Sequence, residues 1–319
     1  MFDKFRVETI LIPFRTLFHA DWSAGPKSRF VCTAERTADG WTVMPPRLVG
    51  DTADFVDTLF NSAGPSLAGF DFPIGLPVAY GQIAGLTDFP AALEVFGLRE
   101  WAEFFAVAEL AEQVSPRRPF YPRLSKAGVK QGDLVSGLGV ATFDQLLRRC
   151  DRPTSTRRRP ACSMFWTLGP SQVGKAAIAG WREIIMPARR RGARLWPFDG
   201  ALAELAGPRP VIAETYPADA YRQVELEMRG NMSKLRQGDR HEVMVGLCDR
   251  ARQHGITFSP ELCRQVAEGF GARRDGDDAF DALIGLLGMI EVVDGRRVER
   301  PVHRGASDDL EGWILGQSE

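Results

Sequence analysis

Several acidic residues of this 319-residue chain stand where an apolar segment ends or a helix begins. Asp21 closes TLFHAD, Asp71 closes SLAGFD, and Glu214 closes VIAE. Near the C-terminus, DDAFDAL places Asp278 and Asp281 three residues apart, on one face of an expected helix. Ligands of α/β sheets gather at the carboxyl ends of strands. If the three strands are parallel neighbours, their acidic residues converge, and these five carboxylates are the catalytic candidates.

Clustered carboxylates define the chemistry to expect. They repel one another unless a cation neutralises them, and Mg²⁺ or Mn²⁺ suits oxygen ligands of this kind. Two such ions about 3.5–4 Å apart can activate a water molecule and stabilise the leaving oxygen during phosphodiester hydrolysis. The pattern therefore indicates a metal-dependent hydrolase with one or two Mg²⁺ or Mn²⁺ ions.

Each of these residues also has a structural interpretation. A strand-end Asp often caps a turn or a helix, and the helix dipole favours Asp278 at a helix N-terminus. Asp277, four residues before Asp281, is a competing partner for it. His19 shares a strand face with Asp21 and is either a partner of the site or a hydrogen-bonded core residue. The argument for a shared site rests on the common placement of the separate acidic segments.

The elements that carry these residues form two blocks of sequence. We expect strands over 16–23, 29–36, 41–44, 66–73 and 209–217, helices over 51–61, 237–254, 259–268 and 277–293, and a short closing strand in EGWILG. This arrangement predicts an α/β core over 15–73 plus 209–316, an N-terminal extension over 1–14, and a helical insertion over 74–208.

The insertion carries a strong positive charge although the chain has a net charge of only −1. Residues 115–196 contain 17 Lys and Arg against four acidic residues, so the rest of the chain is acidic. Such a basic surface attracts polyanions, including nucleic acid; a solvated Arg-rich loop is the alternative interpretation. Candidate substrate-binding residues are Arg117, Arg118, Lys126, Lys130, Arg157, Arg158 and Lys175.

The stretch GPSQVGKAA (169–177) fits most of the phosphate-binding pattern G-x-x-x-x-G-K. The complete pattern requires Ser or Thr after the Lys, to hold Mg²⁺, whereas this chain has Ala176. The surrounding sequence also lacks the strand–helix–strand frame of that nucleotide-binding class. We therefore expect a turn into a helix over 174–185, from whose start Lys175 can contact a phosphate.

The five cysteines are scattered and contain no C-x-x-C pair, which favours a reducing cytoplasm over a disulfide framework. No apolar run approaches the roughly 18 residues of a membrane helix, so we expect no membrane association. The sequence does not indicate an oligomeric state.

The motifs HADWS, GFDFPIGLP, AETYPA and DDAFDAL together resemble a bacterial family described as predicted ribonuclease-H-fold nucleases (domain-of-unknown-function family 429). The last helix is also similar to that of bacterial Holliday-junction resolvases. The resemblance covers most of the chain. It implies a ribonuclease-H-like mixed α/β sheet in the order 3-2-1-4-5, flanked by helices and interrupted by the insertion. It also implies that Asp21, Asp71, Asp278 and Asp281 are metal ligands, with Glu214 specific to the smaller family.

Three functions are compatible with these features. The first is a metal-dependent nuclease that binds nucleic acid through its basic insertion. The second is an actin-like-fold phosphotransferase acting on a small substrate, with DWSAGPK as a phosphate-binding hairpin; this class also needs a second Gly-rich loop and usually a duplicated core. The third is a non-catalytic nucleic-acid-binding protein that has kept the fold.

Overall fold

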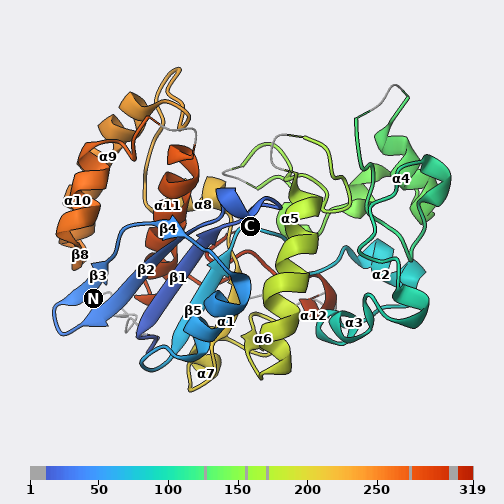
Figure 1. Cartoon of the computed structure of the whole chain (residues 1–319), viewed down its shortest axis with the longest axis horizontal. Helices are drawn as coiled ribbons and strands as arrows, with labels where there is room; N and C mark the ends of the chain where they lie inside the picture. The colour runs from blue at the N-terminus through green and yellow to red at the C-terminus, as the bar shows by residue number, and fades with distance from the viewer. Residues whose placement is uncertain are drawn as a thin grey trace, which may run out of the picture.

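The computed structural model describes residues 12–125, 128–154, 157–169, 172–272, 275–301 and 308–318 (Figure 1). These residues form an α/β protein with one mixed sheet of eight strands, in the order β6-β7-β5-β1-β2-β3-β8, with β4 paired to β2 beside this path. The strands are β1 (Thr16–Asp21), β2 (Phe30–Thr37), β3 (Gly40–Val43), β4 (Arg47–Leu48), β5 (Ser66–Phe70), β6 (Arg194–Leu195), β7 (Val211–Glu214) and β8 (Ile256–Phe258).

Three neighbouring strands at the centre of the sheet run in the same direction. β5 pairs in parallel with both β1 and β7, whereas β2 runs antiparallel to β1 and β3. In register, Ala20 lies opposite Phe70, and Phe70 lies opposite Glu214. Because parallel strands end at the same edge of a sheet, the residues at the ends of β1, β5 and β7 meet at one edge.

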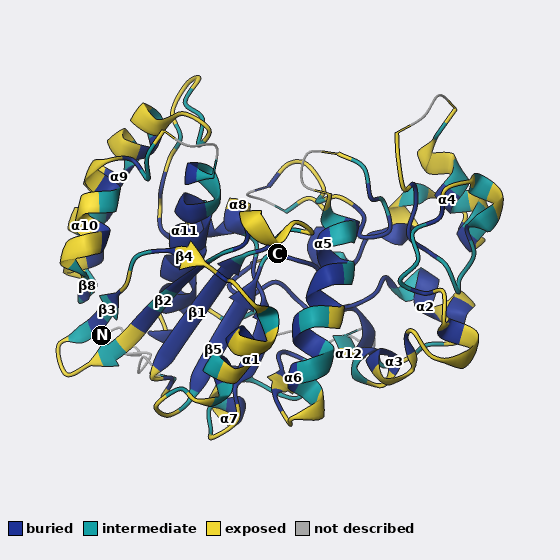
Figure 2. Cartoon of the chain, viewed as in Figure 1, coloured by how far each residue is buried: buried dark blue, intermediate teal, exposed yellow. Residues whose placement is uncertain are grey.

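The two faces of the sheet are covered by different helices. Helix α11 (Gly276–Val293) packs on β1, β2 and β5, and α8 (Pro217–Gln223) packs against α11. Helix α1 (Thr52–Phe60) covers the opposite face, where Phe55 contacts Phe18 edge to face. Alternate residues of β1 divide between the faces, since Leu17 joins the apolar cluster of α11 and Phe18 joins that of α1. Figure 2 shows α11 and the central strands buried.

Helices α9 (Gln237–Gln253) and α10 (Pro260–Ala267) lie at the β8 end of the sheet, with their outer faces exposed (Figure 2). Their bounds agree with the helices expected over 237–254 and 259–268. Asp51 caps α1 by accepting hydrogen bonds from the backbone N–H groups of Ala53 and Asp54. The sequence therefore places the long helices of the core correctly, because their caps and periodicity are local signals.

Residues 74–208 contain far more loop than the expected mainly helical insertion. Their α-helices are short: α2 (Val78–Ala84), α3 (Phe89–Val95), α4 (Gln131–Leu138), α5 (Val173–Gly180), α6 (Met186–Arg190) and α7 (Leu202–Leu205). Soon after α3, the chain turns at Gly97, where φ is +83°, and at Arg99, where φ is +46°. These left-handed conformations cannot continue a right-handed helix. In contrast, the helix expected over 174–185 forms, as α5 and the π-helical turn that follows it.

Three strands of the sheet lie outside the sequence-based prediction. β4 and β6 have two residues each and β8 has three, too few to give a clear alternating pattern. β6 lies in the last part of the segment assigned to the insertion and pairs with β7, so this part of the segment belongs to the sheet. The closing EGWILG segment forms an isolated bridge from Ile314 to Glu214, after the short helix α12 (Asp308–Glu311).

A glycine in α11 allows the helix to approach β1 closely. A Cβ atom at Gly285 would lie 2.0 Å from Cε1 of His19. His19 is fully buried; its Nδ1 lies 3.1 Å from the Ala282 carbonyl oxygen and its Nε2 lies 2.9 Å from the Thr215 hydroxyl. Of the two interpretations of His19 given above, the structure therefore supports the hydrogen-bonded core residue. Its contacts help to fix the position of α11 on the sheet.

We predict that Gly285→Ala destabilises the protein by about 1–3 kcal/mol, because the added methyl group forces α11 away from His19. Denaturant-induced unfolding measures this change. Gly246→Ala in α9 is the matched control, since a Cβ atom there meets nothing within 4 Å. We expect this control to be neutral or to stabilise the helix. Equal stability of the two variants would contradict the packing argument.

Candidate active site

The ends of β1 and β5 bring Asp21 and Asp71 together. The two carboxyl groups share a hydrogen bond, and the backbone N–H of Trp22 donates to Oδ1 of Asp71 over 2.6 Å. Burial raises the pKa of Asp71 to about 7, against the opposing effect of these hydrogen bonds. Burial also raises the pKa of Asp21 well above its usual value, and the charges of Asp71 and Asp281 add to the rise.

The first turns of α11 add Asp278 and Asp281 to this edge of the sheet. Asp281 is buried, and burial raises its pKa. Burial raises the pKa of the less enclosed Asp278 to about 6, with a further contribution from the charge of Asp277. Both α11 carboxylates act on Asp21 by like-charge repulsion. The fold therefore groups the four expected ligands Asp21, Asp71, Asp278 and Asp281, and their repulsion favours a bound cation.

Two residues that the sequence did not single out also contact this group. The Tyr221 hydroxyl, from α8, donates a hydrogen bond to Oδ1 of Asp281. The Lys234 ammonium, from the segment between α8 and α9, forms an ion pair with Oδ2 of the same carboxylate. Lys234 lies 47 residues before Asp281 in the chain, so no local pattern links them. Its charge lowers the pKa of all four carboxyl groups, against the larger effect of burial.

The donor set of this group suits a hard divalent ion, since all four ligands offer carboxylate oxygens. However, in the described parts of the chain no three His, Cys, Asp or Glu side chains are arranged so that they could hold a metal ion. Asp281 directs one oxygen at Tyr221 and the other at Lys234. The residues therefore fit Mg²⁺ or Mn²⁺ in type, but Asp281 is engaged elsewhere.

Glu214 lies apart from the four-carboxylate group in its contacts. Its two oxygens accept from both terminal nitrogens of Arg148, over 2.6 and 2.7 Å, and Oε2 also accepts from the backbone N–H of Ile74. Arg148 is completely buried and also pairs with Asp151. Burial raises the pKa of Glu214 to about 6, although Arg148 opposes the rise. Glu214 thus joins the core to residues of the insertion.

The candidate substrate-binding residues differ widely in exposure. Arg157 is buried and donates to the backbone carbonyls of Cys150 and Asp151, so it supports its own loop. Arg118 donates to the carbonyls of Ala106 and Val107. The other candidates are more accessible to solvent. Lys130 and Arg158 are exposed and Lys175 is half-buried. Arg117 is also half-buried, with its guanidinium over the ring of Trp101. Lys126 lies outside the described residues.

Lys175 lines two adjoining hollows beside α5. One has a volume of about 500 Å³ and includes Arg118 and Arg123; the other has about 460 Å³ and includes Arg182 and Ala24. Ala24 follows Asp21 by three residues, on the loop that leads out of β1. A basic surface of the insertion therefore borders the loop that leaves the carboxylate group.

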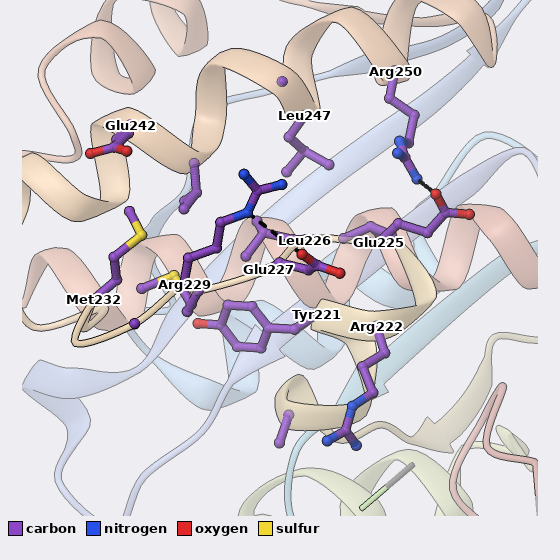
Figure 3. A pocket seen from close by; sticks show the side chains of 16 residues that line it. Tyr221, Arg222, Glu225, Leu226, Glu227, Arg229, Met232, Glu242, Leu247 and Arg250 are labelled. Carbon is purple, nitrogen blue, oxygen red and sulfur yellow. Dashed lines mark hydrogen bonds and ion pairs between the residues drawn. The ribbon is translucent and has the colours of Figure 1, made fainter. Parts of the chain in front are cut away.

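A separate cavity of about 1230 Å³ lies between α8 and α9 (Figure 3). Tyr221 lines it and connects it to the carboxylate group through Asp281. Its charged lining residues are balanced in sign, namely Arg222, Arg229 and Arg250 against Glu225, Glu227 and Glu242. Arg229 pairs with Glu227, and Arg250 pairs with Glu225. The charge balance gives this cavity no preference for a polyanion.

Comparison with family models, with curated proteins and with solved structures finds no match to this chain. Among the helices of the described residues, none has both the length and the apolar composition to span a membrane. Function must therefore be argued from the site itself.

We predict that Asp71→Asn stabilises the metal-free protein at pH 8. The pKa of Asp71 in the folded protein is about 7, above its ordinary value of 3.8. Protonated Asp71 therefore contributes fully to the free energy of unfolding below pH 3.8, and this contribution is lost as the pH rises through 7. The variant removes the cost of burying this carboxylate in its charged form, to which the charge of Asp281 adds. We place this cost at ~1–2 kcal/mol for this partly exposed group, or about 2–6 °C in Tm. Thermal unfolding in EDTA at pH 5 and pH 8 tests this.

The difference between variant and wild type should shrink at pH 5, because Asp71 is then protonated in the folded protein and no buried charge has to be accommodated. Asp39→Asn, at an exposed turn position, is the control and should change Tm equally little at both pH values. A Tm of Asp71→Asn that falls below that of the wild type at pH 8 would refute this account of the buried charge.

Proposed function

We propose that this protein is a metal-dependent nuclease of the ribonuclease-H-like class. The observation that carries the proposal is the meeting of Asp21, Asp71, Asp278 and Asp281 at the carboxyl edge of β1 and β5. The strand path β3-β2-β1-β5-β7 also supports it, because it is compatible with the implied order 3-2-1-4-5 if the two-residue strands β4 and β6 are left out of the count. In this proposal the cofactor is Mg²⁺ or Mn²⁺.

The four carboxylates would hold the ion, with Asp21 and Asp71 supplied by the sheet and Asp278 and Asp281 by α11. When bound, a divalent ion supplies activation of water and stabilisation of the leaving oxygen. The chain itself positions the ligands. The Trp22 backbone N–H orients Asp71, and the contact of His19 with the Ala282 carbonyl holds the α11 backbone beside Asp281 against β1. Glu214 supports the site from a distance by holding Arg148.

Nucleic acid is the proposed substrate because basic side chains border the loop next to the carboxylates. Lys175 and Arg182 line the hollow that includes Ala24, and the guanidinium of Arg182 lies 5.8 Å from the ring centre of Phe105. Cationic side chains beside an aromatic ring suit a phosphate backbone with its bases. The charge of the insertion then serves to bring a polyanion to the acidic site.

The phosphotransferase alternative has less support. That class requires a second nucleotide-binding loop and usually two copies of the core, whereas the described residues form a single sheet. The segment after β1 forms a short 3₁₀ turn (Pro26–Ser28), and Arg29 binds the carbonyls of Ser23 and Ala24 while pairing with Glu183. Ser23 and Ala24 are thereby tied to the helix that follows α5.

We predict Mn²⁺- or Mg²⁺-dependent cleavage of nucleic acid by the full-length protein. Labelled single-stranded, duplex and branched DNA and RNA are incubated with each metal and resolved on gels. Asp21→Asn and Asp278→Asn should each lower the rate by at least ~100-fold, because even residues that only orient metal ligands typically contribute 10–100-fold. Asp39→Asn should retain the rate of the wild type.

Two outcomes would overturn the proposal. Cleavage that survives in both site variants would place the activity in a contaminant or at another site. Salt-sensitive binding of nucleic acid without cleavage under any metal condition would favour the non-catalytic binding protein.

A further inference from the structure

Asp281 is the member of the carboxylate group whose oxygens are both engaged by the chain. Tyr221 donates to one oxygen and Lys234 pairs with the other. The Asp281 side chain is 5% exposed, whereas that of Lys234 is 41% exposed. The ammonium therefore reaches inward from the surface to a buried carboxylate.

Lys234 also compensates the charge of the whole group. Its charge acts on Asp21, Asp71 and Asp278 as well as on Asp281. A like-charge group of this kind needs a cation, and a Lys side chain or a metal ion can supply it. A divalent ion held by Asp21, Asp71 and Asp281 would need an oxygen of Asp281, and both of these oxygens are engaged, one by Tyr221 and one by Lys234. In the described residues no three such side chains are arranged to hold a metal ion.

The backbone at Lys234 is anchored, so the side chain is the part that can move. Its carbonyl oxygen accepts a hydrogen bond from Arg240, which is buried and also donates to the carbonyls of Gly269 and Gly271. The Lys234 side chain, in contrast, is bound at its ammonium end and is partly open to solvent. Rotation of its flexible stem into water requires no change of the backbone.

We propose that Lys234 is a built-in counter-cation of the carboxylate group and that a divalent ion displaces it. In the metal-free protein Lys234 holds Asp281 turned toward itself and Tyr221. On metal binding, the ammonium leaves for solvent and Asp281 turns to join Asp21 and Asp71. This inference rests on the proposed function, since it assumes that the carboxylates bind the ion. It makes Lys234 a positioning residue that tunes metal affinity.

The chain allows a direct test because it contains only six Lys residues. The full-length protein is treated with an amine-acetylating reagent with and without Mn²⁺, and the labelling rate of each Lys is followed by mass spectrometry of peptides. Displacement should raise the rate at Lys234 several-fold, because its amine loses its ion-pair partner. Lys27, Lys130 and Lys175 serve as internal references and should be unchanged. An unchanged or slower rate at Lys234 with Mn²⁺ bound would overturn the inference.

Mn²⁺ binding measured by calorimetry complements the labelling. Lys234→Met removes the competing cation. We expect the Mn²⁺ affinity of this variant to be at least ~10-fold higher than that of the wild type, because no ion pair has to break before the metal binds. Arg47→Met, which removes an exposed charge on β4 outside the carboxylate group, should bind Mn²⁺ like the wild type. A Lys234→Met variant with unchanged or weaker affinity would also overturn the inference.

Asp21→Asn separates this inference from the proposed function. Loss of Mn²⁺ binding in Asp21→Asn places the ion in the carboxylate group; unchanged Lys234 labelling would then refute displacement alone. Absence of Mn²⁺ binding in the wild type, or equal binding in wild type and Asp21→Asn, would refute the metal site and displacement together.

Discussion

Repulsion among carboxylates at one edge of the sheet is the constraint around which this molecule is arranged. Parallel pairing of β1 with β5 sets Asp21 beside Asp71, and α11 adds Asp281 and Asp278 from above the same edge. Burial and mutual charge raise the pKa values of all four groups. A protein gains no stability from such a group without a cation, so its presence is an argument for function.

The packing around this edge holds the charged group in place. His19 is buried between β1 and α11, and Gly285 leaves the space that its ring occupies. The contact of the ring with Thr215 extends the same hydrogen-bonded layer to the end of β7. The contacts of His19 therefore help to fix the distance between the sheet and α11, and with it the position of Asp281 relative to Asp21.

A second buried charge system joins the basic insertion to the acidic core. Arg148 is enclosed between Glu214 and Asp151, with paired hydrogen bonds to both carboxylates. Breaking one side of such a pair would leave a buried charge without compensation, which is far more costly than the pair itself is stabilising. The pairing with Arg148 explains why Glu214 is buried at the end of β7 without contacting the four-carboxylate group. It also holds the insertion in a fixed position relative to the core.

The sequence by itself determined the main elements of the core and the carboxylates that were candidates for a site. Short apolar runs that end in polar or turn residues marked β1, β2 and β5. The caps and periodicity marked the long helices, and the strand-end positions marked Asp21 and Asp71. These signals are local, since they depend on residues within one or two turns or along one strand. The same local signals failed in residues 74–208, where left-handed turns end the helices, and at β6 and β8, which are too short to show a pattern.

Only the tertiary structure decided which charged groups meet. It paired Lys234 with Asp281 across 47 residues, placed Arg148 on Glu214 across 66, and buried Arg157 in its own loop. Long, flexible side chains can reach many partners, and the choice depends on where the backbone carries them and on which buried charges need compensation. The sequence supplied the carboxylates; the fold decided that four of them share one site and that an ammonium from a distant loop occupies it with them.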